Sequence, residues 1–177
     1  MGGTGAVVAV WTAGHSTRSI DELAALLIDQ GIGRLIDVRT IPRSRHNPQF
    51  NREALEAARL PFTYRHAPEL GGLRRPDADS RNVAWRHPGF RGFGDYMETP
   101  DFITALDQLI GEARAAPTAI MCAEAVPWRC HRSLIADALV ARGMEVRHIT
   151  GPGEPRIHTL TPFARLAGDR VTYHGLA

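Results

Sequence analysis

TAIMCAEAVPWRCHRSLIADALVARGMEVRHI, residues 118–149, is the stretch that decides the fold, because it contains one complete strand–helix–strand unit. The apolar run at 118–122 predicts a buried strand, and the helical spacing of apolar residues over 128–142 predicts a helix. Gly143 ends that helix, and residues 145–149 predict a second strand. Two strands joined through a helix run parallel with a right-handed crossover. The stretch therefore predicts a parallel α/β sheet.

The same alternation of strand and helix covers the N-terminal part of the chain. The strands expected there are residues 6–12, 34–39 and 62–66. The helices expected there begin at Ser19, cover roughly 51–60, and begin again at Thr99. A chain of 177 residues suits one domain with a real core. We therefore expect a single α/β domain over residues 1–177, with a core over about 6–150, a mostly parallel sheet of about five strands and helices on both faces.

Two segments depart from this pattern. Residues 67–94 are rich in Gly and Pro, which predicts a long, lid-like loop over the carboxyl-terminal edge of the strands. Residues 151–177 are weakly patterned and form a C-terminal extension, in which 170–173 is expected to add an edge strand.

The composition narrows the class of protein. Hydrophobic residues make up 44% of the chain and charged residues 23%, which is typical of a globular protein. No apolar run approaches the ~20 residues that a membrane-spanning helix needs, and the first apolar stretch has no basic flank. We therefore expect a cytoplasmic protein with no membrane partner and with both cysteines reduced.

All 21 basic residues other than histidine are arginines, because the chain has no lysine. Schiff-base chemistry and lysine general bases are thereby excluded. The net charge of +2 is too small to indicate nucleic-acid binding by itself.

Polar side chains cluster where the expected strands end. In open α/β sheets, ligands bind outside the carboxyl ends of the strands. The residues at those ends are His15, Asp37, Arg39, His66, Glu69, Cys122 and Glu124. The sequence therefore predicts one site at this edge of the sheet.

The segment after residue 121 holds the expected catalytic residues, which are Cys122, Glu124, Cys130 and His131. A thiol at a helix N-terminus beside cationic side chains ionises more readily than a free thiol. We expect a nucleophilic or redox-active cysteine, with Glu124 or His131 carrying the proton. The competing interpretation is a pair of small cysteines packed as hydrophobic residues.

Two known types of cysteine site fit this segment less well. A phosphatase-type or rhodanese-type loop matches in the order of Cys122 and Arg129, but not in the spacing or in glycine content. A zinc site formed by Cys122, Cys130, His131 and a carboxylate is the other type, but the sequence lacks the CxxC pair of many structural zinc sites. We assign no metal ligand and no particular cofactor, and the sequence specifies no oligomeric state.

Arginines form a second cluster. The residues expected to bind substrate or its anionic groups are His15, Ser16, Asp37, Arg39, Arg43, Arg45, Glu69 and Arg132. Residues 73–92 add five Arg against two Asp, together with Trp85 and Phe90. Arginines interleaved with aromatic residues suit base stacking and phosphate neutralisation, although a solvated loop has a similar composition.

Five segments resemble the bacterial and archaeal domain-of-unknown-function family 488. They are GHSTRS (14–19), LIDVRTIPRSRHNPQF (35–50), PELGG (68–72), FRGFGDYM (90–97) and MCAEAVPWRCHRSLIADAL (121–139). The resemblance covers about residues 12–150 and implies a functional site without a named reaction, although members carry labels related to DNA repair. The positions that match the family signature are His15, Ser16, Asp37, Arg39, Pro42, Ser44, Arg45, Glu69, Gly71, Gly72, Cys122, Glu124, Cys130, His131 and Arg132.

The leading functional hypothesis is an enzyme that acts on a phosphate-bearing substrate, a nucleotide or nucleic acid, which makes the chain a DNA-repair candidate. A non-catalytic nucleic-acid-binding module is the first alternative; it would depend on Arg74, Arg75, Arg81 and Arg86 and not on the cysteines. A thiol or metal sensor is the second alternative.

Overall fold

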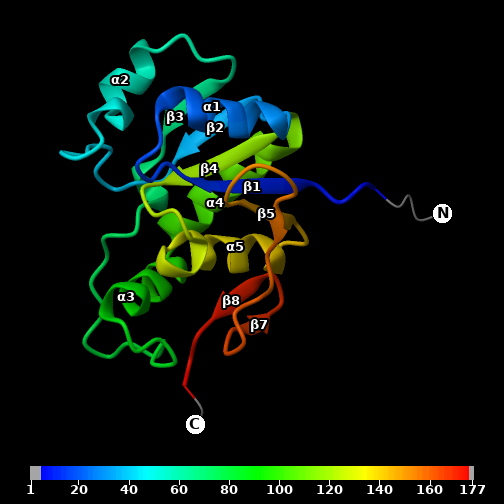
Figure 1. Cartoon of the computed structure of the whole chain (residues 1–177). Coiled ribbons are helices and arrows are strands. Elements are labelled where there is room, and N and C mark those ends of the chain that lie inside the picture. Colours follow the sequence, from blue (N-terminus) through cyan, green and yellow to red (C-terminus); the bar gives the residue numbers. More distant parts are fainter. Residues whose placement is uncertain (1–4, 176–177) are drawn as a thin grey trace.

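The computed structural model describes residues 5–175, which contain five α-helices and eight strands (Figure 1). The strands are β1 (Ala9–Gly14), β2 (Arg34–Asp37), β3 (Thr63–His66), β4 (Thr118–Cys122), β5 (Glu145–Ile149), β6 (Arg156–Ile157), β7 (Arg165–Ala167) and β8 (Arg170–Thr172). The helices are α1 (Ile20–Asp29), α2 (Arg52–Ala57), α3 (Pro88–Met97), α4 (Pro100–Ala115) and α5 (Arg132–Ala141). Short 3-10 turns cover Pro48–Phe50, Pro68–Leu70 and Pro127–Arg129. None of the helices within residues 5–175 has the length and apolar character that crossing a bilayer requires.

The main sheet has the order β3-β2-β4-β1-β5-β6, and its first five strands are parallel, which confirms the α/β prediction. It has six strands rather than the expected five, because β6 pairs antiparallel with β5 at the edge. Residues 170–172 form a strand, as expected, but this strand pairs with β7 in a separate hairpin.

Helices cover both faces of the sheet, as expected (Figure 1). One face carries α1 and α2, whose buried residues pack on alternate strand residues such as Ala119 and Met121. The other face carries α4 and α5, which pack on Ile120 and Cys122, with α3 at the end of that layer. The period of two along β4 therefore divides its side chains between two separate cores.

Several predicted boundaries were wrong by a few residues. The first strand spans 9–14 rather than 6–12, and the helix expected over 51–60 covers only 52–57. The helix expected from residue 128 begins at Arg132, because Pro127–Arg129 forms a 3-10 turn and Cys130 has an extended backbone. Ser19 and Thr99 cap their helices as expected, each accepting a hydrogen bond from a backbone N–H.

The expected loop over residues 67–94 contains the start of a helix. Helix α3 begins at Pro88, where the His87 side chain accepts the Gly89 N–H. Its three glycines lower helix propensity, which is why the sequence pattern resembles a loop. Burial of Phe93 and Met97 against the α4–α5 layer overrides that propensity.

The strand order creates a crevice between β1 and β4. The connection that leaves β1 runs through α1 over one face, whereas the connection that leaves β4 runs through α5 over the other face. Neighbouring parallel strands with diverging connections form a ligand crevice at their carboxyl ends. Those ends lie on the side where α2 and α3 extend, at the left of Figure 1. The topology therefore places the candidate site before any side chain is considered.

A directed chain of hydrogen bonds fixes the start of α5 to the sheet. The buried Arg132 guanidinium donates to Thr12 Oγ1 at 3.0 Å, and the Thr12 hydroxyl lies 2.6 Å from His148 Nδ1. His148 Nε2 lies 2.9 Å from His158 Nδ1, and His158 Nε2 lies 2.8 Å from Asp137 Oδ1. Because the Thr12 proton points to His148, each following imidazole donates to the next group. The chain therefore links the buried Arg132 cation to the buried Asp137 carboxylate through a hydroxyl and two imidazoles, and we name it the Arg132–Asp137 relay.

Acidification should destabilise the protein through His148. Burial first, and then the charges of His158 and Arg132, lower the pKa of His148 to about 3. The unfolded histidine has a pKa of ~6.5, so between these values the unfolded state binds more protons. The contribution of His148 to the free energy of unfolding is fully present above pH ~6.5. It is lost by about 1.4 kcal/mol per pH unit as the pH falls toward 3. Urea unfolding between pH 7 and 4 measures this slope, which should be smaller in His148→Gln and unchanged in His46→Gln, a variant of an exposed histidine. Equal slopes in wild type and His148→Gln would contradict the assignment.

Substitution of Gly14 should be strongly destabilising. A Cβ atom at Gly14 would overlap the Glu124 carbonyl in the crevice, whereas a Cβ at Gly111 on α4 would meet no atom within 4 Å. We expect Gly14→Ala to lower the free energy of unfolding by about 1–3 kcal/mol or more. Gly111→Ala, the matched control, should raise it by about 0.5–1 kcal/mol because alanine favours a helix. Chemical denaturation of both variants gives the two values, and similar values would refute the close approach.

Candidate functional site

A pocket of about 660 Å³ opens at the carboxyl ends of β1, β2 and β4. It lies where the strand-end pattern places the site. Of the expected residues, those that line it are His15, Arg39, Arg43, Cys122, Glu124, Cys130 and His131. Hydrophobic and aromatic side chains form much of the remaining wall: Ile41, Leu73, Phe90 and Trp128. The pocket therefore combines thiols, titratable groups and apolar surface.

The two cysteines meet at the bottom of this pocket. Both are free and buried, and their sulfur atoms lie 2.7 Å apart. Cys122 is the last residue of β4, and Cys130 follows the Pro127–Arg129 turn. This turn brings together two cysteines that are eight residues apart in the chain. Cys130 Sγ also accepts the Arg132 backbone N–H at 3.4 Å and lies 3.5 Å from His131 Nδ1. This sulfur is therefore surrounded by donors at the start of α5.

The environment separates the acidities of the two thiols. Burial, and then its hydrogen bond to Cys130, raise the pKa of Cys122 well above the usual value. Burial also works against ionisation of Cys130, but hydrogen bonds from Cys122 and His131 and the charges of His131 and Arg132 overcome it. The pKa of Cys130 therefore lies well below the usual value. Cys130 is the thiolate of the pair, and Cys122 is its thiol donor.

His131 is positioned to exchange a proton with Cys130. Its Nε2–H donates to the Val38 carbonyl at 3.0 Å, which leaves Nδ1 facing the Cys130 sulfur. The backbone of Gly72 packs on the imidazole so closely that a Cβ there would overlap the ring, and Phe93 contacts the ring edge-on. This close approach holds His131 in one orientation.

Glu124 lies at the mouth of the pocket with an exposed side chain. Within residues 5–175 its carboxylate has no hydrogen-bond or ion-pair partner, whereas its backbone carbonyl accepts Arg132 Nη2 at 2.6 Å and the Cys122 thiol at 3.7 Å. The carboxylate is therefore available to a ligand, and the backbone holds the catalytic segment together.

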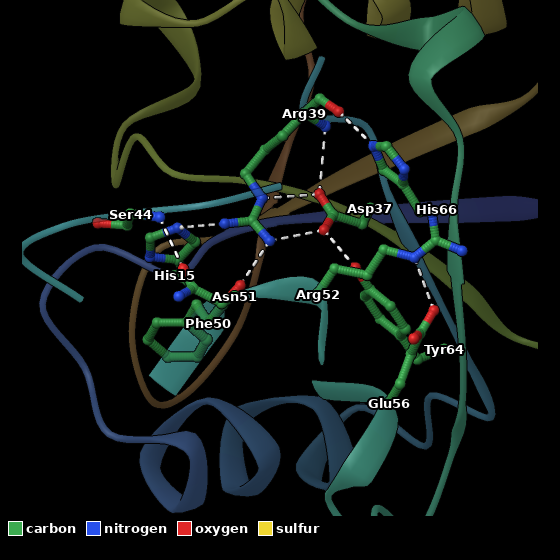
Figure 2. A network of polar contacts seen from close by, with 10 residues as sticks. All are labelled: His15, Asp37, Arg39, Ser44, Phe50, Asn51, Arg52, Glu56, Tyr64 and His66. Carbon is green, nitrogen blue, oxygen red and sulfur yellow. Dashed lines mark hydrogen bonds and ion pairs between the residues drawn. The ribbon is translucent and has the colours of Figure 1, made fainter. Parts of the chain in front are cut away.

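Asp37 and Arg39 form a fixed ion pair behind the pocket wall (Figure 2). Arg39 Nε donates to Asp37 Oδ1 at 2.8 Å and Nη2 donates to Oδ2 at 2.6 Å, while the Tyr64 hydroxyl donates to Oδ2 at 2.6 Å. Arg39 also donates to the Phe50 carbonyl at 2.6 Å. Asp37 therefore holds the Arg39 guanidinium in place. Asp37 itself is fully buried and does not line the pocket.

His15 completes this wall. Its Nδ1 lies 2.8 Å from the Ser16 carbonyl, its Nε2 lies 3.3 Å from Arg39 Nη1, and its ring stacks on Phe50 at 4.4 Å. Burial first, opposed by the bond to Ser16, lowers the pKa of His15, and the charge of Arg39 adds to that effect. Ser16 adopts φ +49° and donates its N–H to the Ala123 carbonyl. His15 and Ser16 therefore shape the crevice through backbone hydrogen bonds and ring stacking.

Other expected residues lie away from the cavity. Arg132 is fully buried beneath the pocket. It can influence a bound substrate only through its hydrogen bonds to Cys130 and Glu124. Arg45 and Glu69 are exposed outside the pocket, and Glu69 accepts the Tyr96 hydroxyl through its backbone carbonyl. Direct anion binding by these three residues therefore has no geometric basis at this pocket.

The lid-like segment reaches the pocket through Phe90, which was expected to stack on bases, and through Gly72 of the family signature. Its Leu73, His87 and Gly89, which the sequence did not indicate, also line the cavity, whereas its arginines do not. Trp128 and Arg129 are further lining residues that the argument missed. An exposed tryptophan directly after Pro127, in the loop between the cysteines, is the signal that could have identified them.

The zinc alternative finds no ligand set in the part of the chain that the structure describes. Residues 5–175 contain no group of three or more His, Cys, Asp or Glu side chains arranged to hold a metal ion. His131 directs Nε2 to a carbonyl, and Glu124 points to solvent.

Comparison with known proteins identifies one family. The family model described as domain of unknown function DUF488 matches residues 19–139, which confirms the resemblance noted in the sequence. No curated protein and no solved structure matches the chain.

The ionisation of Cys130 can be measured by alkylation. We expect iodoacetamide to label Cys130 with a midpoint below pH ~8.5, the value for a free cysteine, because donors surround its sulfur. Cys122→Ala removes the thiol donor, so the midpoint for Cys130 should rise. Peptide mass spectrometry across pH resolves the two sites, and Cys122 in a Cys130→Ala variant should stay slow throughout. A wild-type midpoint at or above 8.5 would contradict the thiolate assignment.

Proposed function

The chain belongs to the DUF488 family, and we propose that it is an enzyme in which the Cys130 thiolate attacks a phosphate-bearing substrate of the nucleotide or nucleic-acid class. The observation that carries the proposal is the Cys130 sulfur, which accepts from Arg132 N–H, contacts Cys122 at 2.7 Å and lines a pocket of about 660 Å³. A cysteine that only packs in a core needs no such set of donors.

The proton of the nucleophile has a defined acceptor. One proton is shared between Cys130 Sγ and His131 Nδ1, and Nε2–H stays on the Val38 carbonyl in both states. Cys122 stabilises the thiolate through its own S–H, and Arg132 stabilises it through charge and its backbone N–H. As the sulfur bonds to the substrate, the bond between the attacked atom and its leaving oxygen breaks. The leaving oxygen takes the proton held by His131, or one from Glu124 at the pocket mouth.

The pocket walls support a ligand with both an anionic and an apolar part. The Arg43 side chain is 72% exposed and only loosely paired with Glu53, at 3.7 Å. Arg129 is a further exposed lining residue, and Trp128 and Phe90 supply aromatic surface. Guanidinium groups bind phosphate and aromatic faces stack on bases, which favours the nucleotide class over a purely apolar substrate.

Contact between the two sulfur atoms also favours a second candidate, reversible thiol–disulfide chemistry. A mild peroxide treatment would then remove two hydrogen atoms, and both cysteines would stop reacting with iodoacetamide. In Cys122→Ser this redox cycle must disappear, whereas an enzyme that uses Cys130 alone as nucleophile keeps measurable turnover. The Cys122→Ser variant thus separates the two functions.

Catalysis is tested with a panel of nucleotides and short oligonucleotides, followed by mass spectrometry of products and of adducts on Cys130. Cys130→Ser should reduce turnover by about 10³-fold or more, and Glu124→Gln by about 10²–10⁴-fold, with melting temperatures close to wild type. Glu154→Gln, at an exposed position away from the pocket, is the matched carboxylate control and should retain full turnover. Unfolding of the Cys130 and Glu124 variants, or full turnover in Cys130→Ser, would disprove the proposal.

A further inference from the structure

A second pocket, of about 350 Å³, adjoins the first across a single side chain. Trp128 lines both pockets. The polar groups and aromatic rings of the second pocket come from the ends of β5 and β6 and from the lid-like segment, and they include Trp85, His148, Arg156, His158 and Thr159. The mechanism proposed above uses none of these residues.

We propose that the second pocket binds the neighbouring nucleotide of a single-stranded nucleic acid whose reacting unit occupies the first pocket. This inference rests on the proposed function and narrows its substrate to a chain of at least two nucleotides. Trp128 is the stacking platform between the two units, and Arg156 contacts the phosphate group that links them.

The exposure of Trp128 is the first support. Its side chain is 56% exposed, although it follows a buried proline in a short 3-10 turn between two pockets. Exposed tryptophans on single-strand-binding surfaces stack on bases, and this contact tolerates any base because every base has an aromatic face. A ridge of this kind divides a cleft into two subsites of one extended ligand.

Unpaired arginines are the second support. The Arg156 guanidinium lies over the Trp128 ring at 5.6 Å from its centre. Arg156 and Arg129 are both exposed, and within the described residues neither side chain has a hydrogen-bond or ion-pair partner. Arg43 and Arg129 line the first pocket, and Arg156 lines the second. The two pockets together thus carry three exposed cations against one exposed carboxylate, Glu124, which suits a phosphodiester chain.

The histidines of the second pocket are already engaged. Both nitrogens of His148 and of His158 take part in the Arg132–Asp137 relay, so neither ring is available to coordinate a metal or to act as a base. Trp85 Nε1 is buried and, within residues 5–175, has no partner, so it remains a donor that a polar ligand atom or a water can satisfy. A spare donor beside engaged imidazoles suits a base, and the phosphate is left to Arg156.

The test uses fluorescein-labelled oligothymidylates of one, two, four and eight nucleotides, as DNA and as RNA, in polarisation titrations with the full chain. We expect the affinity to rise by about tenfold or more between one and two nucleotides. Trp128→Ala should weaken binding of the longer probes by about tenfold or more, and Trp128→Phe should restore most of it. Arg156→Gln should weaken those probes and reduce the salt dependence by about one ion, with little effect on the mononucleotide. Arg170→Gln, on the separate β7–β8 hairpin, is the matched control and should bind like wild type.

Equal affinity for all probe lengths, no binding of any probe, or equal behaviour of Arg156→Gln and Arg170→Gln would overturn the second subsite. These results are distinct from a failure of the enzyme proposal. Adducts of Cys130 with mononucleotides, without a length effect, would remove only the subsite. Length-dependent binding that needs Trp128, with no reaction at Cys130, would remove only the enzyme.

Discussion

The parallel pairing of β1 and β4 continues past the ends of both strands, where the N–H groups of His15 and Ser16 donate to the carbonyls of Cys122 and Ala123. This continuation brings two loops that are more than a hundred residues apart in the chain into backbone contact. Gly14 permits that contact because no side chain separates it from the Glu124 carbonyl. Every other feature of the site, from the thiol pair to the Asp37–Arg39 wall, is arranged around this junction.

Two buried arginines beside the junction are stabilised in different ways. Arg39 pairs directly with Asp37, so its charge is neutralised locally and it serves to hold the wall. Arg132 donates to backbone carbonyls and to the Thr12 hydroxyl, and its link to a carboxylate passes through the imidazoles of His148 and His158 to Asp137. A buried charge requires compensation. Placing the compensating carboxylate at a distance leaves the positive potential of Arg132 directed at the Cys130 sulfur.

The thiol pair and the exposed arginines lie at different depths of the first pocket. The sulfur atoms and His131 lie at the bottom of the cavity, where burial strengthens electrostatic interactions. Arg43, Trp128 and Arg129 are exposed residues of the same lining. In the function that we propose, a ligand held by phosphate and base contacts to these residues would present only its reacting group to the thiolate. The apolar walls would then serve to exclude water from the sulfur.

Local patterns in the sequence determined the α/β class, the capped helix starts at Ser19 and Thr99, and the gathering of His15, Arg39 and Cys122 at one edge, since periodicity and strand direction are local properties. The sequence pattern did not predict helix α3, because its glycines lower helix propensity and only burial stabilises the helix. The contact of Cys122 with Cys130, the burial of Arg132 and the exclusion of Arg45 and Glu69 from the pocket were decided by tertiary structure alone. They depend on how a turn at Pro127 folds back and on which surfaces the helices cover, and neither is encoded in the spacing of residues along the chain.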